Sequence, residues 1–464
     1  MKAGIPDKAL RDFARIVGDD GLRTGAADRW AYSYDNSKRQ RLPGAVAVPR
    51  TEQHIVALVN ACREHGIALC ARGLGTGTAG AAVPPEHGLV ISTEAMKRVV
   101  IDAPNRVAVA EPGATNGAVQ AAAAEHGFFW PPDPTSANYS TVGGNLACNA
   151  AGPRAVKYGT PRENTLGLRA VSGTGALLKT GCYTTKGVVG YDLTRLIIGS
   201  EGTLAVMTEA TLKLTPLPES VRVLRFLFDS VVAAAAAVSR LMAQPIVPRA
   251  LEFADKAALR LIREYAAPEI PAAAQAMLMV EAEGSADHVD DNAAALIAAG
   301  SGEGLLEARA AKDEAEGKEL WRARKALSPA LRTIAPKKIN EDVVVPVSEM
   351  ASFIGELEAL EQRYAIPIVC FGHAGNGNIH VNLLIDPSDE KQMHGAQACL
   401  REVFRAVIDR RGTLSGEHGI GFDKKNFVGL EIEPATLALM KQIKHQFDPD
   451  NILNPGKLFP ATQD

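Results

Sequence analysis

Residues 67–93 restrict the fold more than any other part of this chain of 464 residues. They read IALCARGLGTGTAGAAVPPEHGLVIST and contain the pattern GxGxxG. In a Rossmann fold these glycines follow a strand and open a helix. The apolar residues 67–70 predict the strand, but Pro84 and Pro85 follow the glycines, and the residues after them predict another strand. The required helix is missing, so the sequence argues against a Rossmann fold.

The same glycine-rich loop suits a different way of binding a phosphate. Four of residues 73–80 are glycine, and such a backbone adopts positive φ angles at little cost. Its N–H groups can then converge on one anion, and Arg72 adds positive charge. A flexible surface loop is the alternative interpretation.

Two later segments favour a bound ligand over a flexible loop. Residues 130–168 are rich in proline, glycine, asparagine, serine and threonine but hold few charges, unlike a typical disordered linker. Such a stretch suits backbone and small side chains packed against a large polar molecule. In residues 190–216 we expect strands at 196–198 and 208–216, with a tight turn at 199–202 between them.

Composition excludes several classes of protein. Hydrophobic residues make up 46% and charged residues 22% of the chain, and the net charge is −3, so neither nucleic acid nor an anionic membrane surface is an expected partner. No apolar run suits a membrane-spanning helix, and the amphipathic N-terminus lacks the apolar core of a signal peptide. We therefore expect a cytoplasmic protein, with peripheral attachment to the inner membrane left open. The six cysteines form no CxxC pair, which argues against a cysteine-ligated metal or iron–sulfur site.

Two histidines flank a glycine-rich turn in residues 370–384, CFGHAGNGNIHVNLL. The apolar residues before and after this turn predict two buried strands. His373 would lie at the turn and His380 in the second strand, where alternation places Asn382 on the same side as His380. The pair indicates either half of a metal site or a strand that carries two histidines by chance.

A second polar motif, SGEHGIG, holds Glu417 and His418 between glycines. Alone it is typical of a solvated loop. With His373 and His380 it completes two imidazoles and a carboxylate, the ligand set of a catalytic zinc site with an open position. Zinc lowers the pKa of bound water from ~15.7 to ~7, on the order of 12 kcal/mol, and would acidify a bound alcohol in the same way. A histidine with a pKa near 7 could then accept the proton.

A substrate that carries a carboxylate also needs a cationic partner. The segment KELWRARKALSPALRTIAPKKINEDVVVP predicts a helix followed by a strand, and it contains Arg324 and Lys338. The planar guanidinium of Arg324 suits bidentate binding of a carboxylate, and Lys338 is a second candidate. Solvated surface charges are the alternative interpretation for both residues.

The motifs that carry a family resemblance occur in a fixed order: RGLGTGTAG, PPDPTSANYSTVGGNLACNAAG, KYG and GYDLTRLIIGSEGTLAVMTEATLKLTP. With them the chain resembles the vanillyl-alcohol-oxidase type flavoproteins, which have a PCMH-type FAD domain. Within this group it is similar to the branch of D-lactate dehydrogenases, the glycolate oxidase FAD subunit and D-2-hydroxyglutarate dehydrogenases. The resemblance runs over nearly the whole chain.

The resemblance implies a role for each motif. HAGNGNIH would supply the metal ligands His373 and His380, and GEHG would supply the ligand Glu417 and the base His418. Arg324 falls on the family position that binds the substrate carboxylate. The residues implied to contact FAD are Arg72, Gly73, Leu74, Gly75, Thr76, Gly77, Pro132, Asp133, Ser136, Gly143, Asn145, Asn149, Gly152, Glu201, Gly202 and Asn454.

Three details of the sequence refine these implications. Some relatives tether FAD through a histidine near the glycine loop, but none lies between His65 and His87 here, so we expect non-covalent FAD. Ala151 and Ala205 stand where the family commonly has glycine, which is a small change. The divalent metal is expected to be zinc, with manganese as the alternative.

The expected fold class is α+β. Residues 1–217 would form the two-lobed PCMH-type FAD-binding domain. Residues 218–410 would form a substrate or cap domain, an antiparallel sheet with helices on one face. Residues 411–464 would return to the FAD domain, with Asn454 near the flavin.

The expected function is an FAD- and metal-dependent dehydrogenase that oxidises a D-2-hydroxy acid of the D-lactate or D-2-hydroxyglutarate type. His418 would take the hydroxyl proton, while Arg324, Lys338 and Asn382 face the substrate. Electrons would pass to an electron-transfer flavoprotein, a quinone or a cytochrome, and a homodimer is left open. The alternatives are an FAD subunit that works only inside a glycolate-oxidase-like complex and a flavin oxidase that uses oxygen.

Overall fold

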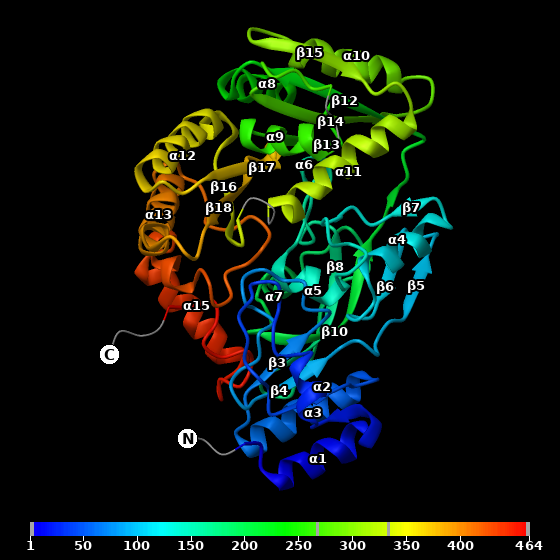
Figure 1. The fold of residues 1–464 in the computed structure, drawn as a ribbon. Helices are drawn as coiled ribbons and strands as arrows, with labels where there is room; N and C mark the ends of the chain where they lie inside the picture. Colours follow the sequence, from blue (N-terminus) through cyan, green and yellow to red (C-terminus); the bar gives the residue numbers. More distant parts are fainter. Residues whose placement is uncertain (1–3, 266–268, 332–334, 461–464) are drawn as a thin grey trace. The chain divides into compact units, whose positions relative to one another are not determined.

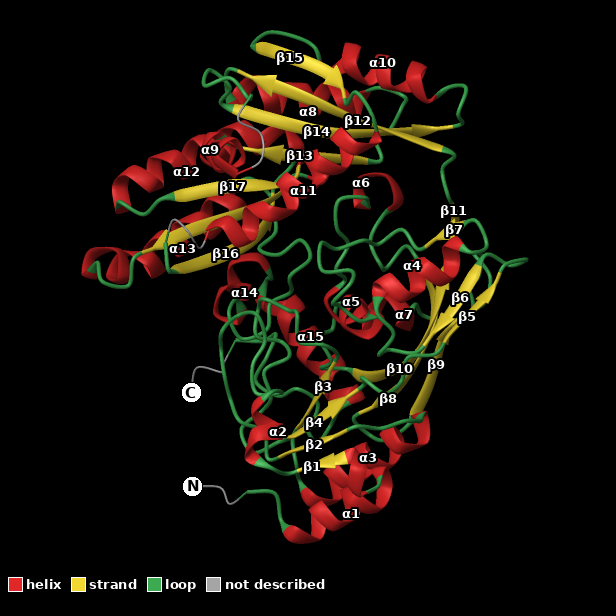
Figure 2. Ribbon diagram, turned by 45° about the vertical axis from the view of Figure 1, so that its right-hand side comes forward, coloured by secondary structure: helices red, strands yellow, loops and turns green. Residues whose placement is uncertain are grey.

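The computed structural model describes residues 4–265, 269–331 and 335–460, which form two compact units. The first unit consists of Met1–Ala151, Gly159–Leu217 and Glu417–Asp464, and the second of Gly152–Tyr158 and Pro218–Gly416. The chain therefore leaves the first unit twice, after Ala151 and after Leu217, and returns to it each time. The colours of Figure 1 trace this path from the N-terminus (blue) to the C-terminus (red). Each unit contains both helices and strands (Figure 2).

The first lobe of the first unit packs helices against a small sheet. Its elements are α1 (Asp7–Val17), η1 (Asp19–Gly21), β1 (Leu22–Arg23), α2 (Ala26–Trp30), β2 (Ala45–Ala47), α3 (Glu52–His65), β3 (Leu69–Arg72) and β4 (Leu89–Ser92). The strand order is β1-β2-β4-β3, with β2 and β3 parallel to β4. Phe13 of α1 and Ile55 and Leu58 of α3 are fully buried in the core of this lobe.

The second lobe of the first unit is built on an antiparallel sheet. Its elements are β5 (Val99–Asp102), β6 (Val107–Ala110), α4 (Asn116–Ala124), β7 (Phe128–Phe129), α5 (Val142–Cys148), β8 (Thr165–Ser172), β9 (Leu177–Gly181), α7 (Leu193–Ile197), β10 (Ala205–Lys213) and β11 (Thr215–Pro216). The strand order is β5-β6-β10-β8-β9, and β7 pairs with β11 separately. The fully buried Trp130 anchors this lobe, and its Nε1 donates to the carbonyl of Asn164 at 3.0 Å.

One predicted strand in this lobe is wrong. Residues 196–198 were expected to be extended, but helix α7 covers all except the last of them. The cause is a local cap, because the Asp192 side chain accepts a hydrogen bond from the backbone N–H of Arg195 at 2.9 Å. The strand expected at 208–216 is present as the end of β10 followed by β11.

The C-terminal segment closes the sheet of the first lobe. Its elements are η5 (Lys425–Phe427), α14 (Val428–Glu431) and α15 (Pro434–Phe447). After α15, Leu453 forms a parallel bridge with Leu69 at the free edge of β3. Leu69 N donates to Ile452 O, and Asn454 N donates to Leu69 O, both at 2.8 Å. The edge of β3 is therefore capped by the end of the chain.

The second unit is built on one seven-stranded antiparallel sheet of order β15-β12-β14-β13-β17-β18-β16. Its strands are β12 (Ser220–Phe228), β13 (Ala250–Ala254), β14 (Ala276–Gly284), β15 (Leu305–Ala310), β16 (Lys337–Val344), β17 (Ile368–His373) and β18 (Asn378–Ile385). Its helices are α6 (Ala155–Tyr158), α8 (Val231–Ala243), α9 (Lys256–Tyr265), α10 (Val289–Gly300), α11 (Glu314–Ala330), η3 (Val347–Glu349), α12 (Met350–Tyr364), η4 (Ala374–Asn376) and α13 (Glu390–Asp409).

Helices of the second unit pack against both faces of this sheet. Helices α8, α10, α12 and α13 cover one face. On this face α10 lies so close to β12 that a Cβ on Gly300 would lie 2.5 Å from the Phe226 ring. On the other face, Leu259 of α9 and Leu327 of α11 join Leu227 in one buried cluster. Phe226 and Leu227 are neighbours on β12, so their side chains point to opposite faces of the sheet. The contact of Gly300 with Phe226 and the cluster around Leu227 therefore lie on opposite faces. The predicted antiparallel sheet with its helical layer is present, and α9 and α11 add a smaller layer opposite.

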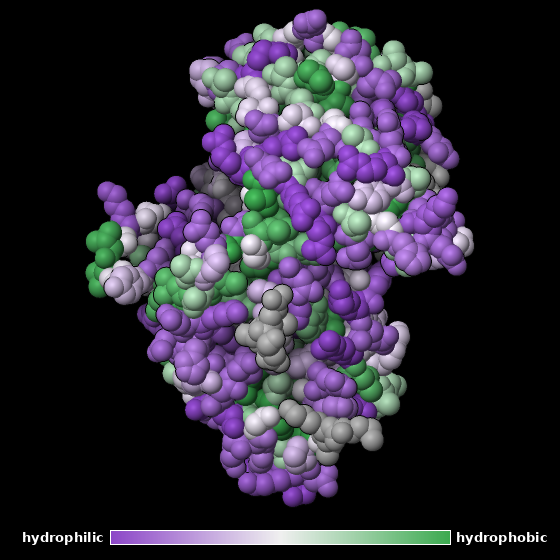
Figure 3. All heavy atoms as spheres, turned by 90° about the vertical axis from the view of Figure 1, so that its left-hand side faces the viewer, coloured by the Kyte–Doolittle hydropathy of each residue, from purple (hydrophilic) through white to green (hydrophobic). Residues whose placement is uncertain are grey.

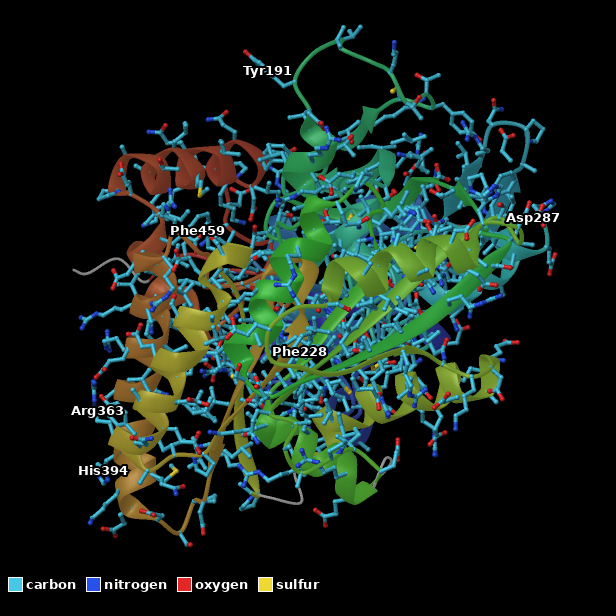
Figure 4. The ribbon with its side chains drawn as sticks, turned by 90° about the horizontal axis from the view of Figure 1, so that it is seen from above. Tyr191, Phe228, Asp287, Arg363, His394 and Phe459 are labelled. Atoms are coloured by element: carbon cyan, nitrogen blue, oxygen red, sulfur yellow. The ribbon has the colours of Figure 1, made fainter. Side chains whose placement is uncertain are left out.

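Hydrophilic residues cover most of the molecular face in Figure 3, with smaller hydrophobic areas between them. Figure 4 shows Tyr191 on one arm of a protruding loop, and this side chain is 96% exposed. Within the described ranges, no helix combines the length and the apolar character that crossing a membrane requires.

Candidate functional site

Close contacts shape the glycine loop that follows β3. Gly75 has a φ of +70°, and a Cβ there would lie 2.2 Å from the Arg72 guanidinium. A Cβ on Gly73 would lie 2.2 Å from Thr141 Oγ1. Arg72 is buried, and its Nη1 donates to the carbonyl of Ala82 at 3.3 Å. Positions 73 and 75 therefore require glycine, and the charge of Arg72 is buried against the loop.

The remaining loop residues leave the loop's outer side accessible. Leu74 is 47% exposed, while Thr76 and Gly77 are half-buried. The Gly77 carbonyl accepts from the backbone N–H of Asn36 at 2.8 Å, which fixes one end of the loop. A loop that is anchored on one side and accessible on the other suits a bound phosphate group.

The predicted cofactor residues of 132–145 form a continuous framework in the first unit. The Asp133 N–H donates to the Ala151 carbonyl at 2.9 Å, and the Pro132 carbonyl accepts from Asn116 Nδ2 at 2.9 Å. The Ser136 carbonyl accepts from Ser140 N, and a Cβ on Gly143 would lie 2.7 Å from Pro112 Cβ. The chain therefore runs very close to itself here, which explains the many small residues.

The buried polar atoms of the first unit that make no hydrogen bond with the described residues include Ser140 Oγ, Asn145 Nδ2 and Ser200 Oγ. Burying such groups without a partner costs about 1–3 kcal/mol each. A polar cofactor laid along segments 140–145 and 200–202 would supply the missing partners. The donor set of this region therefore fits a large polar molecule such as FAD.

Other predicted cofactor residues use their side chains within the chain. Asn149 has a φ of +56°, and its Oδ1 accepts from Thr160 Oγ1 at 3.0 Å and from Arg162 N at 3.1 Å. Glu201 accepts from the backbone N–H groups of Ile420 at 2.6 Å and Gly421 at 2.7 Å. Burial raises the pKa of Glu201 despite these two bonds. Both side chains hold the framework together.

The C-terminal turn is tied to this framework. Asn454 Nδ2 donates to the carbonyl of Glu201 at 2.7 Å and to that of Ala81 at 3.1 Å, so it joins the Glu201–Gly202 turn to the end of the glycine loop. Lys457 was missed by the sequence analysis. Its buried Nζ donates to the carbonyls of Ala81 and Val83. Lys457 stands in NPGKLF, and nothing in this local sequence indicates that its charge is buried.

A second cluster of polar side chains lies on one face of the sheet in the second unit. His373 and His380 stand on the adjacent strands β17 and β18, with ring centroids 5.2 Å apart and planes at 85°. Glu252 lies opposite His373 in the register of β13 and β17, and Asp342 lies opposite His380 in that of β16 and β18. Each histidine therefore has a carboxylate on the neighbouring strand.

Glu252 contacts two of the predicted site residues. Its Oε1 lies 2.5 Å from His373 Nδ1, and its Oε2 lies 2.7 Å from Arg324 Nη2 on α11. Burial alone would raise the pKa of Glu252, but the charges of His373 and Arg324 outweigh it and hold this pKa below its usual value. The guanidinium of Arg324 also lies over the Phe371 ring, 4.7 Å from its centroid.

Asp342 is completely buried beside His380. Its Oδ1 accepts from Asn378 Nδ2 at 2.7 Å and lies 3.6 Å from His380 Nδ1. The Asp342 backbone carbonyl accepts from Gly416 N at 3.0 Å. The sequence analysis missed Glu252 and Asp342. The sequence signal of Glu252 is a single acid in the otherwise apolar strand ALEFA, and that of Asp342 is the acidic pair Glu341–Asp342 in front of the apolar run VVVP.

The predicted substrate residues differ in their availability. Asn382 Nδ2 donates to the carbonyls of Val369 and His380, both at 3.1 Å, and its Oδ1 accepts from Asn340 Nδ2 at 2.6 Å. Its amide is therefore engaged on the sheet. Lys338 is half-buried and lies two positions before Asn340 on β16, so alternation places both on the face that carries Asp342.

The turn between β17 and β18 leaves no room for side chains at its glycines. A Cβ on Gly372 would lie 2.3 Å from the carbonyl oxygen of Asn378, and one on Gly375 would lie 2.3 Å from Val156. Gly377 has a φ of +70°, and a Cβ there would lie 1.9 Å from the Val345 carbonyl oxygen. The glycines thus allow His373 and His380 to face each other across a tight turn.

Glu417 and His418 begin the last segment of the first unit. Glu417 Oε2 accepts from the backbone N–H of Ala151 at 3.2 Å, next to the predicted cofactor framework. Glu417 also follows directly after Gly416, whose N–H is bound to Asp342 in the second unit. Chain connectivity alone therefore limits how far Glu417 can lie from Asp342, because consecutive Cα atoms are about 3.8 Å apart.

Two family models together match most of the chain. Residues 43–181 match the family described as FAD binding domain, and residues 217–458 match the family described as FAD linked oxidases, C-terminal domain. The chain is 37% identical to the glycolate oxidase subunit GlcD of Bacillus subtilis over 98% of its length and 97% of that protein. It is 36% identical to the D-lactate dehydrogenase of Archaeoglobus fulgidus over 92% of its length and 95% of that protein.

Solved structures share the fold at low sequence identity. A p-cresol methylhydroxylase with bound substrate aligns with a TM-score of 0.80 at 18% identity, over 99% of this chain and 98% of that one. An alkyldihydroxyacetonephosphate synthase aligns with a TM-score of 0.77 at 19% identity, over 98% of this chain and 86% of that one. These likenesses show the fold.

Proposed function

Because the chain belongs to the FAD-linked oxidases and is an FAD-dependent oxidoreductase, we propose that it oxidises a D-2-hydroxy acid to the corresponding 2-oxo acid. The support is twofold. Relatives of nearly the same length are named for D-lactate and glycolate. The sheet of the second unit also carries the polar groups that such a substrate requires.

The single observation that carries the proposal is the buried cluster of Glu252, Arg324, His373, His380 and Asp342 on one sheet face. Charged side chains are rarely buried unless they are paired or functional. Arg324 has its Nη2 on Glu252 and its guanidinium face over Phe371, while its buried Nε makes no hydrogen bond with the described residues. We propose that this free edge of the guanidinium binds the substrate carboxylate. Lys338 is proposed as a second anchor.

We propose that His373, His380 and Glu417 hold a divalent metal, zinc or manganese. His373 Nδ1 is bound to Glu252, and His380 Nδ1 lies 3.6 Å from Asp342, so we propose Nε2 of each ring as the ligand nitrogen. Asp342 is a further oxygen donor beside His380. A divalent metal at this place would lower the pKa of the substrate hydroxyl. His418, next to Glu417 in the chain, is proposed to accept the hydroxyl proton.

FAD supplies the electron chemistry when bound, because its ring accepts a hydride from the substrate carbon. The chain's own part is to bind and orient. The glycine loop and segments 132–145 and 200–202 are proposed to hold FAD without a covalent bond, and Asn382 is proposed to keep His380 in place through its bond to the His380 carbonyl. We propose a cytoplasmic location and a quinone, a cytochrome or an electron-transfer flavoprotein as acceptor.

Anaerobic titration of the yellow holoenzyme tests the reaction. D-lactate, glycolate and D-2-hydroxyglutarate are added in turn, with L-lactate as the stereochemical control. At least one of the three substrates should bleach the flavin absorbance, whereas L-lactate should not. A protein that keeps its flavin oxidised with every 2-hydroxy acid, in the presence of zinc or manganese, would refute the proposal.

A second candidate function follows from the name of one relative. The Bacillus subtilis protein is a subunit of glycolate oxidase, so this chain could act as the FAD subunit of a multi-subunit electron-transfer complex. In that case the isolated chain would bind FAD, be reduced by substrate, and pass electrons to dyes only slowly. Affinity purification from the native cell distinguishes the two, because a stoichiometric iron–sulfur partner supports the complex and its absence supports a self-sufficient enzyme.

A further inference from the structure

Glu252 joins two elements that the proposed function needs in one place. It lies on β13, near the middle of the sheet, and is 2% exposed. One oxygen of its carboxylate holds His373 of β17, and the other holds Arg324 of α11. Strand β17 and helix α11 are therefore linked through the side chain of Glu252, and each of its two carboxylate oxygens already has a partner.

The geometry around Arg324 shows what this link achieves. Arginine side chains have several rotatable bonds, and ordering one costs up to about 2 kcal/mol. Glu252 fixes one edge of the guanidinium and the Phe371 ring fixes its face, 4.7 Å from the centroid. The Nε edge is buried without a partner among the described residues. The guanidinium of Arg324 is thus held in one orientation, and its Nε edge is available to a ligand.

His373 is constrained from the same carboxylate. Its Nδ1 is bound to Glu252, and its ring meets the His380 ring edge-on at 5.2 Å. The cross-strand register of Glu252 and His373 makes this contact a property of the sheet itself. Any movement of Glu252 would therefore displace Arg324 and His373 together.

We propose that Glu252 is a positioning residue that sets the separation between the carboxylate anchor Arg324 and the histidine His373. The proposal rests on the proposed function, since it assigns Glu252 a role in aligning the carboxylate and the hydroxyl of one substrate. Glu252 itself touches neither group. Its effect is geometric, and displacement of a reacting group by about 1 Å costs up to about 100-fold in rate.

A purely structural ion pair is the competing explanation, and the chain offers a matched control for it. Glu283 of β14 is also buried and also pairs with basic groups, Lys157 at 2.6 Å and Arg249 at 3.2 Å. Its partners among the described residues are Lys157, Arg249 and Tyr158, and they include neither Arg324 nor His373. Glu283→Gln therefore reports the cost of losing a buried carboxylate on the same sheet without disturbing the proposed anchor.

The test compares Glu252→Gln and Glu252→Asp with Glu283→Gln in the FAD-loaded protein. Glu252→Gln removes the charge, and Glu252→Asp keeps it on a side chain too short to hold both partners. We expect all three to retain FAD. We expect both Glu252 variants to raise KM for the best 2-hydroxy acid at least about tenfold and to lower kcat as well, while Glu283→Gln changes either constant less than about twofold. If Glu252→Gln does not fold, Glu252→Asp decides the question.

Two binding measurements separate this proposal from the proposed function, because they need no turnover. Oxalate binding by calorimetry reports the carboxylate anchor, and zinc content after loading and desalting reports the histidines. Both should fall in the Glu252 variants and not in Glu283→Gln. If the wild-type protein oxidises no 2-hydroxy acid, the proposed function fails while these measurements still judge Glu252. Glu252 variants that match Glu283→Gln in KM, oxalate affinity and zinc content would overturn the positioning role.

Discussion

In the glycine loop after β3, the groups offered to a ligand are backbone atoms and small side chains, and the nearby Arg72 is buried against the loop. On the sheet face of the second unit, the groups are charged side chains on regular strands. The loop obtains its shape from positive φ angles and from contacts that only glycine permits. The sheet obtains its site from cross-strand register, which places Glu252 opposite His373 and Asp342 opposite His380.

The difference teaches which mutations each region should tolerate. A backbone site is insensitive to the loss of any one side chain but fails when a Cβ is added. A side-chain site fails when one functional group is removed, and here the turn between β17 and β18 also requires glycine. Loss of one region should therefore leave the other intact, and each prediction below would break or sharpen that separation.

The largest effect is expected for His380→Ala. Removing this imidazole should lower kcat/KM by at least about 100-fold and reduce bound zinc or manganese, because even outer-shell changes at a metal site cost 10–100-fold. FAD content should stay as in the wild type, since the glycine loop belongs to the first unit. Flavin absorbance, metal analysis and steady-state rates measure the three properties. Wild-type turnover without metal would contradict the assignment, as would loss of FAD in the variant.

The next effect concerns the stability cost of buried charge in the second unit. Burial raises the pKa of Asp255 to about 7, although its oxygens accept from Ala258 N and Cys370 N. Because this folded-state pKa lies above the ordinary value of 3.8, the folded state binds the extra proton below about pH 7. Asp255 therefore contributes less stability as the pH rises towards 7. Between pH 5 and pH 8 the loss should be roughly 2–3 kcal/mol.

Urea unfolding at pH 5 and pH 8 measures this loss, with Asp255→Asn as the comparison that cannot ionise. The wild type should lose roughly 2–3 kcal/mol more than the variant over this range. Parallel pH dependence of the two proteins would show that Asp255 ionises normally in the folded state.

A smaller effect is expected when a methyl group is added to the backbone site. Gly75→Ala places a Cβ against the Arg72 guanidinium at a φ of +70°, and the left-handed conformation alone costs about 1–2 kcal/mol. FAD affinity should fall about tenfold. Gly66→Ala is the control, because its φ of +61° is similar but nothing lies within 4 Å of its Cβ. Flavin retention after gel filtration compares the two, and equal retention would remove the loop from the FAD site.

The smallest effect is expected outside both regions. Tyr191→Ala changes a side chain that is 96% exposed on a protruding loop (Figure 4). Surface changes of this kind usually alter stability by less than about 0.5 kcal/mol. FAD content, metal content and turnover of the isolated protein should all match the wild type. A fall in any of them would place this loop in a functional site.

The sequence predicted some parts of the sheet site but not others. Apolar runs around HAGNGNIH were sufficient to predict β17, β18 and the shared side of His380 and Asn382, because strand alternation is local. Glu252 and Asp342 could not be found in this way. Their importance depends on which strand lies beside which, and the pairing of β13 with β17 joins residues 121 positions apart.

Local sequence also misassigned or hid several features of the first unit. The apolar residues 196–198 suggested a strand, but the Asp192 cap competes with extension and forms α7. Residues 152–158 lie within the cofactor motifs in sequence yet pack with the second unit, where Gly375 meets Val156. The buried charge of Lys457 depends on carbonyls at Ala81 and Val83, far away in the chain.

Because of the bridge between Leu69 and Leu453, the sheet of the first lobe can be completed only after the C-terminal segment has been synthesised. The loop carbonyl of Ala81 and its partner Asn454 are 373 residues apart. A ribosome that adds about 5–20 residues per second needs roughly 20–75 s to make that stretch. Throughout this time the edge of β3 has no partner from the C-terminal segment, and unpaired strand edges invite association with other chains. The sheet of β1–β4 is synthesised before the other described sheets and is thus closed last, so chaperones that shield a nascent strand edge should matter most for the first lobe.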